Sequence, residues 1–331
     1  MGRVKRKLWT GLLLFALLWT AGAPGEDAAP KETAAPLVPA LELPAPENGS
    51  LVEIPVDQNS LKESIPPKED CYLYAEEGAD PTGYADPSIT VNIGRGRIYN
   101  TDYIYARVRI ASPSQLRTLL ASPLGNMNTT NGHDLARRVN AVTAINGDYP
   151  GGDAFTRRTK GAVMRQGDLM RLKCDGKSDV LVIDNQGDLR VLQQATDQDV
   201  EAVLDTAVNI FTFGPALIID GKPNYDFPDG DIASGKAAQR MVICQTGPLE
   251  YLLITTEGPE DPGSAGLTVN QLIDLLASLP EVRTAYNLDG GSSSTLVFRK
   301  DGKNWRKINA PNNRKVRELK DIIYFASAWG E

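Results

Sequence analysis

Short apolar runs separated by turns rich in Gly, Asp and Asn recur along the chain from about residue 100 onward. The alternation of side chains at Tyr103–Ile110 is typical of a strand with one face in a core. Paired runs on either side of a short turn predict three hairpins. These pairs are Gly161–Met164 with Leu169–Leu172, Val180–Ile183 with Leu189–Leu192, and Arg240–Gln245 with Tyr251–Thr256. Further strands are predicted at Ala141–Ile145, Ala216–Ile219, Thr284–Leu288, Ser294–Phe298 and Ile322–Ser327.

Helical patterns are fewer and shorter. Thr268–Leu279 carries leucines at helical spacing, with Thr268 in the capping position and Gln271 three residues later. Ser112-Pro113 has the form of a helix start, and Asp134–Asn140 is predicted as another short helix. Many hairpins with a few helices predict an α+β fold, built on a mixed, mainly antiparallel twisted β-sheet flanked by helices in one globular domain.

The first 23 residues have the pattern of an export signal. The basic segment Arg3–Lys7 precedes the apolar run Leu8–Ala23, which is shorter than the about 20 residues of a membrane-spanning helix. Ala21–Ala23 has the small-x-small form of a cleavage site, whereas Pro24 disfavours cleavage directly after it. Residues 1–23 are interpreted as a signal peptide or as an uncleaved membrane anchor. Either interpretation places the body of the chain outside the cytoplasm, secreted or held at the cell surface.

Residues 24–70 differ in composition from the rest of the chain. They are rich in Pro, Ala and Glu and have little apolar periodicity, so we interpret them as a disordered tether. The folded domain is predicted to begin near Cys71 and to comprise residues 71–331.

Charge and cysteine content restrict the class of protein. The net charge is −7, and it would be −11 without the four basic residues of the first 23, so nucleic acid is not an expected partner. Membrane contact is expected only through the N-terminal segment. The wide spacing of Cys71, Cys174 and Cys244 argues against a zinc site, and it leaves open one disulfide or three reduced thiols. The oligomeric state stays open.

The segment Asn287–Thr295, NLDGGSSST, holds the densest group of candidate functional residues. A buried strand would deliver the Asp289 carboxylate to a turn in which Gly290 and Gly291 allow close approach of a ligand. The backbone N–H groups and the side chains of Ser292, Ser293, Ser294 and Thr295 would then bind a phosphate or a sugar. The alternative is a plain Gly-Gly hairpin turn with a self-capping Asp.

Three other positions carry candidate chemistry at strand ends. Asn146, Gly147 and Asp148 follow a predicted strand. The Asn146 amide would bind sugar hydroxyls, and the Asp148 carboxylate would act as an acid or a base. A plain turn is the commoner role of such a tripeptide. Arg240 begins a strand and is suited to phosphate oxygens, with a surface salt bridge as the alternative. Glu257 ends the next strand and would place a carboxylate at the same rim.

Other catalytic classes fit the sequence poorly. His133 is the one histidine of the chain, and no G-x-S-x-G segment occurs, which disfavours a serine triad. No cofactor is identified, and Ca²⁺ or Mg²⁺ on Asp and Glu oxygens is not supported by any EF-hand-like run. A hydrolase on this chain would therefore use Asp and Glu side chains.

Several motifs, taken in order, resemble the phosphodiester glycosidase family, which includes the N-acetylglucosamine-1-phosphodiester α-N-acetylglucosaminidases. The similar segments are AINGDYP at 144–150, GAVMRQGD at 161–168, FGPALIIDG at 213–221, the strand that begins at Arg240, the strand that ends at Glu257-Gly258, SAGLT at 264–268, and LDGGSSST at 288–295. Three residues depart from the family pattern: Ser292 and Asp148 stand where the family has glycine, and Pro150 replaces an aromatic residue.

The resemblance implies cleavage of a sugar from a sugar-1-phosphodiester, releasing the free sugar and a phosphomonoester. Arg240 and the Gly290–Ser294 loop would bind the phosphodiester, Asp289 would be the base or the stabilising carboxylate, Asp148 its partner, and Asn146 would position the sugar. The export pattern would make an envelope or extracellular glycopolymer the substrate. Two other hypotheses stay open: a non-catalytic module that binds a phosphosugar polymer, and an envelope assembly factor.

Overall fold

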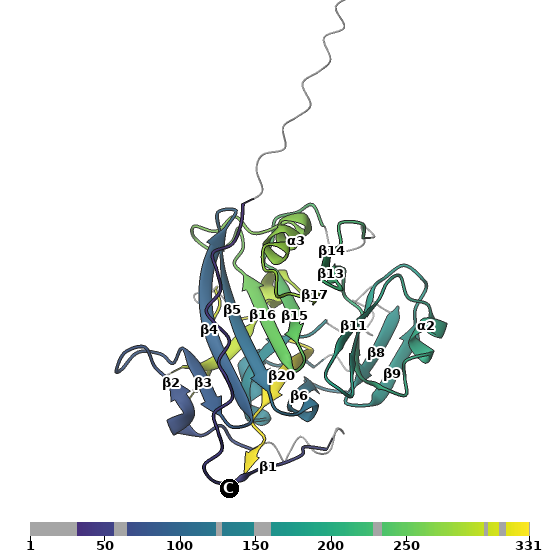
Figure 1. Cartoon of the computed structure of the whole chain (residues 1–331). Helices are drawn as coiled ribbons and strands as arrows, with labels where there is room; N and C mark the ends of the chain where they lie inside the picture. Colours follow the sequence, from purple (N-terminus) through teal and green to yellow (C-terminus); the bar gives the residue numbers. More distant parts are fainter. Residues whose placement is uncertain are drawn as a thin grey trace, which may run out of the picture. The chain divides into compact units, whose positions relative to one another are not determined.

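The computed structural model describes residues 32–55, 65–123, 128–148, 160–227, 234–300, 304–310 and 316–330. The sequence-predicted signal or anchor at 1–23 lies outside these residues. Residues Glu32–Glu331 form one compact unit, shown in Figure 1.

Antiparallel pairing organises the described strands into three main sheets (Figure 1). The largest has nine strands in the order β14-β13-β17-β15-β16-β5-β4-β3-β2. Their bounds are β2 Tyr72–Leu73, β3 Gly83–Asp86, β4 Ile89–Ile98, β5 Thr101–Ile110, β13 Ala216–Ile219, β14 Lys222–Pro223, β15 Met241–Gly247, β16 Glu250–Thr256 and β17 Thr284–Leu288.

Two five-stranded sheets and a short two-stranded pair complete the sheet structure of the described residues. One has the order β19-β18-β7-β20-β6, with β6 Leu116–Leu120, β7 Ala141–Asn146, β18 Leu296–Lys300, β19 Asn304–Lys307 and β20 Asp321–Ala326. The other has the order β11-β10-β12-β8-β9, with β8 Gly161–Arg165, β9 Asp168–Lys173, β10 Val180–Asp184, β11 Leu189–Leu192 and β12 Ala207–Phe211. The pair joins β1 Ser50–Leu51 to β21 Trp329–Gly330.

The three α-helices of the described residues are short: α1 Gly132–Arg138, α2 Asp197–Glu201 and α3 Val269–Ala277. Three 3-10 turns accompany them, η2 at Glu69–Cys71, η3 at Pro113–Gln115 and η4 at Gly291–Ser293. The fold is therefore compatible with the α+β prediction but richer in β-structure, and every recorded strand pairing is antiparallel rather than mixed.

The three hairpins predicted from the sequence are confirmed as β8–β9, β10–β11 and β15–β16. The helix at α3 is confirmed together with its reciprocal cap between Thr268 and Gln271. Ser112 does cap a helical turn, but that turn is the single 3-10 turn η3. It ends there because residues 116–120 pair with β20 as strand β6.

Alternation along β15 and β16 divides the core between the two faces of the nine-stranded sheet. Val242 and Ile254 face the cluster that contains the apolar side of α3. Ile243 and Leu253 face the opposite side, where their cluster also contains residues of both five-stranded sheets. All three sheets therefore contribute to one core.

Part of the stretch interpreted as a tether lies along this domain. The Tyr105 hydroxyl accepts a hydrogen bond from the Val38 backbone N–H at 2.8 Å, and the Arg107 guanidinium donates to the Val38 carbonyl oxygen at 3.1 Å. Residues 32–55 thus have defined contacts well before Cys71, because their prolines and backbone groups meet polar side chains of β4 and β5. Among the residues with described placement, no helix is long and apolar enough to cross a membrane.

Leu272 tests the contribution of α3 to stability. Leu272→Ala should lower the free energy of unfolding by about 3 kcal/mol, because its side chain is fully buried and the truncation leaves a cavity. Leu169→Ala is the matched control, since Leu169 is 41% exposed and should change stability by less than about 0.5 kcal/mol. Equilibrium denaturant unfolding measures both, and equal losses would contradict the assignment of the core.

Candidate active site

Two strand ends from different sheets meet at the loop Asp289–Thr295. The side-chain amide of Asn146, at the end of β7, donates to the Asp289 carbonyl oxygen at 2.7 Å. Its side-chain oxygen accepts from the Thr295 backbone N–H at 2.9 Å, and the Asp289 N–H donates to the Gly147 carbonyl oxygen at 3.2 Å. The segment Asn146–Asp148 and the loop Asp289–Thr295 are therefore in direct contact, and the Asn146 side chain forms hydrogen bonds with both ends of the loop.

Glycine is needed at the start of this loop. An added Cβ on Gly290 would lie 2.7 Å from the Gln239 carbonyl oxygen, so a side chain would force the loop away from β15. Gly291 has φ +59° and donates its N–H to that same oxygen at 2.9 Å. Close backbone packing therefore places the loop beside Arg240, the residue that follows Gln239.

Ser292, which stands where the family pattern has glycine, lies on the exposed side of the turn. Its backbone is outside the positive-φ region that would require glycine. Its hydroxyl accepts a hydrogen bond from Arg317 at 3.2 Å. The substitution consequently leaves the loop's packing against Gln239 unchanged.

Several buried polar atoms around the loop lack partners within the described structure. They are Asn287 Oδ1, Ser293 Oγ, Ser294 Oγ and Thr295 Oγ1. A buried polar group without a hydrogen bond costs about 1–3 kcal/mol, so folded proteins rarely leave such a group unsatisfied. Their grouping on one loop indicates a place where oxygen-rich ligands or water complete the hydrogen bonding.

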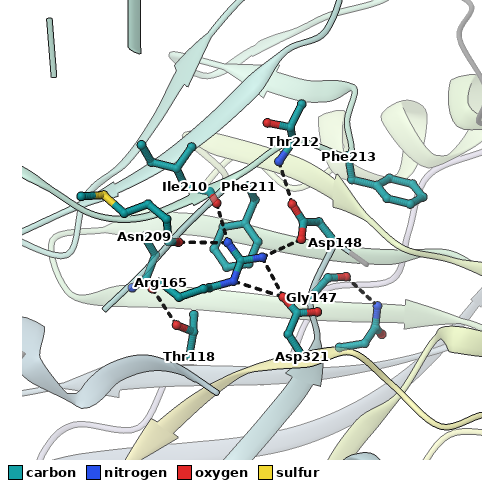
Figure 2. A network of polar contacts seen from close by, with 12 residues as sticks. Thr118, Gly147, Asp148, Arg165, Asn209, Ile210, Phe211, Thr212, Phe213 and Asp321 are labelled. Carbon is teal, nitrogen blue, oxygen red and sulfur yellow. Dashed lines mark hydrogen bonds and ion pairs between the residues drawn. The ribbon is translucent and has the colours of Figure 1, made fainter. Parts of the chain in front are cut away.

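A buried arginine connects this region to the second five-stranded sheet (Figure 2). The Arg165 guanidinium, at the end of β8, donates to Asp148 Oδ1 at 2.6 Å and to Asp321 Oδ2 at 2.7 Å. It also lies 3.9 Å from the centroid of the Phe211 ring. The other oxygen of Asp148 accepts from the Thr212 backbone N–H at 2.7 Å. These three charged side chains are at most 2% exposed, so the network lies in the interior.

Gly147 permits this network to form. An added Cβ on Gly147 would lie 2.3 Å from an oxygen of Asp321, so only glycine lets that carboxylate approach the β7 end. Burial raises the pKa of Asp321 above its usual range, and the nearby Asp148 and Asp289 carboxylates raise it further. Arg165 opposes this shift by stabilising the charged form.

Arg240 is buried, which excludes the alternative of a surface salt bridge. Its guanidinium donates from Nε to the Leu267 carbonyl oxygen at 3.0 Å and from Nη2 to the Lys236 carbonyl oxygen at 2.6 Å. Burial lowers its pKa to about 10. Within the described residues it forms no ion pair with a carboxylate, so the guanidinium is a fixed positive charge available to an anion.

Glu257 follows β16 and is also buried. One oxygen accepts from the Ala310 backbone N–H at 2.9 Å, whereas Oε2 has no partner in the part of the chain that is described. Burial, with a smaller contribution from Asp261, raises its pKa to about 7. The backbone hydrogen bond from Thr256 N–H to the Arg240 carbonyl oxygen keeps Glu257 on the strand neighbouring that arginine.

Sequence reasoning missed Arg165 and Asp321. Each was visible as a charged residue at the end of an otherwise apolar run, GAVMR and DIIYF. Nothing in either segment alone shows that the two would meet, because the strands β8 and β20 belong to different sheets.

Possible metal ligands, the cysteines and the FGP segment are further features of the described residues. No group of three His, Cys, Asp or Glu side chains there is arranged to hold a metal ion. Cys71, Cys174 and Cys244 are all free thiols. The segment FGP lies under the loop, because the Asn287 side-chain amide donates to the Gly214 carbonyl oxygen at 2.7 Å and the Tyr286 hydroxyl accepts from the Phe213 N–H at 3.1 Å.

Comparison with known proteins supports the fold and the family. A family model for phosphodiester glycosidases matches residues 139–326. The catalytic domain of zebrafish N-acetylglucosamine-1-phosphodiester alpha-N-acetylglucosaminidase, described as auto-inhibited by pro-peptide, aligns with a TM-score of 0.57 and 17% identity, over 78% of this chain and 92% of that one. A hypothetical protein from Synechocystis aligns with a TM-score of 0.54 and 15% identity, over 76% of this chain and 65% of that one. No curated protein matches the sequence significantly.

Glu257 predicts a dependence of stability on pH. Its pKa is about 7 when folded against an ordinary 4.5, so between these pH values the folded protein keeps a proton that the unfolded chain has released. This stabilisation is present below pH 4.5 and is lost as the pH rises towards 7. Relative to Glu257→Gln, the wild type should lose on the order of 2 kcal/mol of unfolding free energy across this window.

Comparing the wild type with the Gln variant isolates Glu257, because Asp321 changes the unfolding free energy with pH equally in both proteins. Denaturant titrations of both proteins at pH 4.5, 6 and 7.5 would measure the difference between their unfolding free energies. If the unfolding free energies of the wild type and the Gln variant change equally with pH, the raised pKa of Glu257 in the folded protein is contradicted.

Proposed function

This chain belongs to the phosphodiester glycosidase family, and from its site we propose that it hydrolyses sugar-1-phosphodiesters, releasing a free sugar and a phosphomonoester. The observation that supports this most directly is the buried Arg240 guanidinium, which carbonyl oxygens orient and no described carboxylate neutralises. A phosphodiester has one negative charge and oxygens that match this donor geometry.

The loop supplies the second half of the anion site. Gly290 and Gly291 pack against the residue before Arg240, so the loop lies against the backbone of this segment. The hydroxyls of Ser293, Ser294 and Thr295 are buried and have no recorded partners in the described structure. Donors held in place before the substrate arrives stabilise charge that develops on the leaving phosphate.

The two carboxylates Asp289 and Asp148 have different proposed roles. Asp289 extends from the β17 end and is proposed as the base that activates water, or as the carboxylate that stabilises positive charge on the sugar carbon. Water then adds to that carbon, the carbon–oxygen bond to phosphate breaks, and the phosphate retains the bonding electrons. Both oxygens of Asp148 are engaged by Arg165 and the Thr212 N–H, so its proposed contribution is to hold Arg165 and the strand end in place.

The sugar and the location of the substrate are further parts of the proposal. N-acetylglucosamine is the first candidate because it is the sugar in the zebrafish enzyme's name. The basic start and apolar run of residues 1–23 support export, and an exported enzyme would act on an envelope or extracellular glycopolymer.

Asp289→Asn should reduce turnover of a methyl diester of N-acetylglucosamine-1-phosphate by at least about 100-fold, because the amide neither accepts the proton of water nor carries charge. Asp220→Asn is a matched control, since Asp220 also precedes a glycine in a turn but is exposed. Release of free sugar measures the effect. Near-native turnover in Asp289→Asn would remove Asp289 from the mechanism, and diester binding without release by the wild type would favour a binding module.

Arg240→Ala should also lower turnover by at least about 100-fold, since it removes the charge opposite the leaving phosphate. Arg240→Lys keeps the charge but loses the forked geometry, so it should recover part of the activity. Initial-rate kinetics together with a thermal melt separate loss of activity from loss of folding. Equal activity of the folded Ala and Lys variants would contradict an electrostatic role.

A further inference from the structure

A second concave region lies next to the candidate active site, and its Lys307 is close enough to Glu257 for their charges to interact. It is a cavity of about 840 Å³ between β4, the β18–β19 hairpin and the start of α1. Its lining includes Arg95, Arg299, Arg306, Lys307 and His133, with Asp80 as the one acidic residue of that lining. We call this the basic groove.

The charge of the basic groove is opposite to that of the whole chain. Three arginines and Lys307 line it in a protein whose net charge is −7. Clustering of like charges destabilises the free protein by repulsion, and an anionic ligand relieves that repulsion. The groove therefore has the electrostatic character of an anion-binding surface.

Two arginines of the groove lack the carboxylate partners that other surface arginines have. Arg97 pairs with Asp102 at 2.6 Å, and Arg109 pairs with Glu250 at 2.7 Å. By contrast, Arg306 forms no recorded ion pair or hydrogen bond with a described residue, and Arg95 only donates to the Ile308 carbonyl oxygen at 3.4 Å. Their guanidinium groups are thus available to a ligand.

The other two cations form a fixed part of the wall. The Arg299 guanidinium lies 4.3 Å from the Trp305 ring centroid and 5.3 Å from that of Tyr72, and the residue is only 8% exposed. Lys307 is half-buried on β19, where burial lowers its pKa and the nearby Glu257 and Asp261 carboxylates partly offset that shift. A charge held between aromatic rings loses little freedom when it binds an anion, which favours binding.

The basic groove is structurally continuous with the active-site loop. Strand β18 begins at Leu296, directly after Thr295, and carries Arg299 into the groove. An added Cβ on Gly132, next to His133, would lie 3.0 Å from the Thr295 side chain, so the start of α1 packs on the end of the loop. A chain that places one unit at the loop can therefore continue along the same hairpin.

We propose that the basic groove is a secondary binding site for the phosphodiester backbone of an anionic glycopolymer, separate from the unit that is cleaved. This inference rests on the proposed function for the identity of the polymer. Arg95 and Arg306 bind successive phosphates through forked hydrogen bonds, and Arg299 provides a fixed positive charge in the wall. The volume lies within the range of small-ligand pockets, about 300–1,000 Å³, so it accommodates a short stretch of chain.

The test uses the full chain and poly(glycerol phosphate) without attached sugars, so that binding does not require cleavage. The double variant Arg95→Gln/Arg306→Gln should weaken binding by about fivefold or more at low salt, and the difference should shrink as salt screens the charges. Arg190→Gln/Lys222→Gln is the matched control, because it removes the same charge from exposed side chains outside the groove. Isothermal titration at two salt concentrations measures all three proteins.

Two assays separate this proposal from the proposed function. Turnover of the short methyl diester should be unchanged in the groove variant, whereas the KM for a sugar-bearing polymer should rise by a similar factor. If the wild type cleaves neither substrate but the groove variant still loses polymer binding, the proposed catalytic function is wrong and the proposed polymer binding by the basic groove is supported. Equal polymer affinity of the groove variant and the control variant would contradict polymer binding by the basic groove. Binding only to anionic lipid vesicles would also contradict it.

Discussion

The ion pairs of Arg165 with Asp148 and Asp321 are the interaction on which the site depends. One guanidinium on β8 holds the carboxylates at the end of β7 and the start of β20, so it joins the two five-stranded sheets. The hydrogen bond from the Thr118 hydroxyl to Asn209 Oδ1 is a second polar contact between these sheets. Removing one partner from a buried charge network costs about 3–5 kcal/mol, because the remaining charge has no water to solvate it. The arginine therefore keeps the acidic groups together in the interior against their mutual repulsion.

Asn146 and two close glycine contacts extend that constraint to the loop. Asn146 binds both ends of the segment Asp289–Thr295, and Gly290 packs directly on the Gln239 carbonyl oxygen. The loop is thereby held next to Arg240, which is itself held by two carbonyl oxygens. In the proposed function, Arg240 and the loop hydroxyls would bind the phosphate that leaves, and Asp289 would activate water.

Most elements with a strong local pattern were predicted correctly. The hairpins at β8–β9, β10–β11 and β15–β16 follow from alternation and turn residues, and α3 follows from its leucine spacing and its cap. Residues 116–120 were not predicted as a strand, because their partner β20 lies some 200 residues later in the chain. The contacts of residues 32–55 were also missed, since a proline-rich segment owes its order to the side chains it meets and not to its own pattern.

The sequence by itself determined which segments carry chemistry: a strand that ends in Asn-Gly-Asp, a strand that begins with Arg240, and a strand that leads into Asp289 and its glycines. It also determined their family resemblance, since their order along the chain is a property of sequence alone. Only the tertiary structure decided how these groups are paired. It placed Arg165 between Asp148 and Asp321, left Arg240 without a described carboxylate, and raised the pKa of Glu257 to about 7. Burial and charge proximity decide such properties, and both depend on strands that are distant in sequence and adjacent in space.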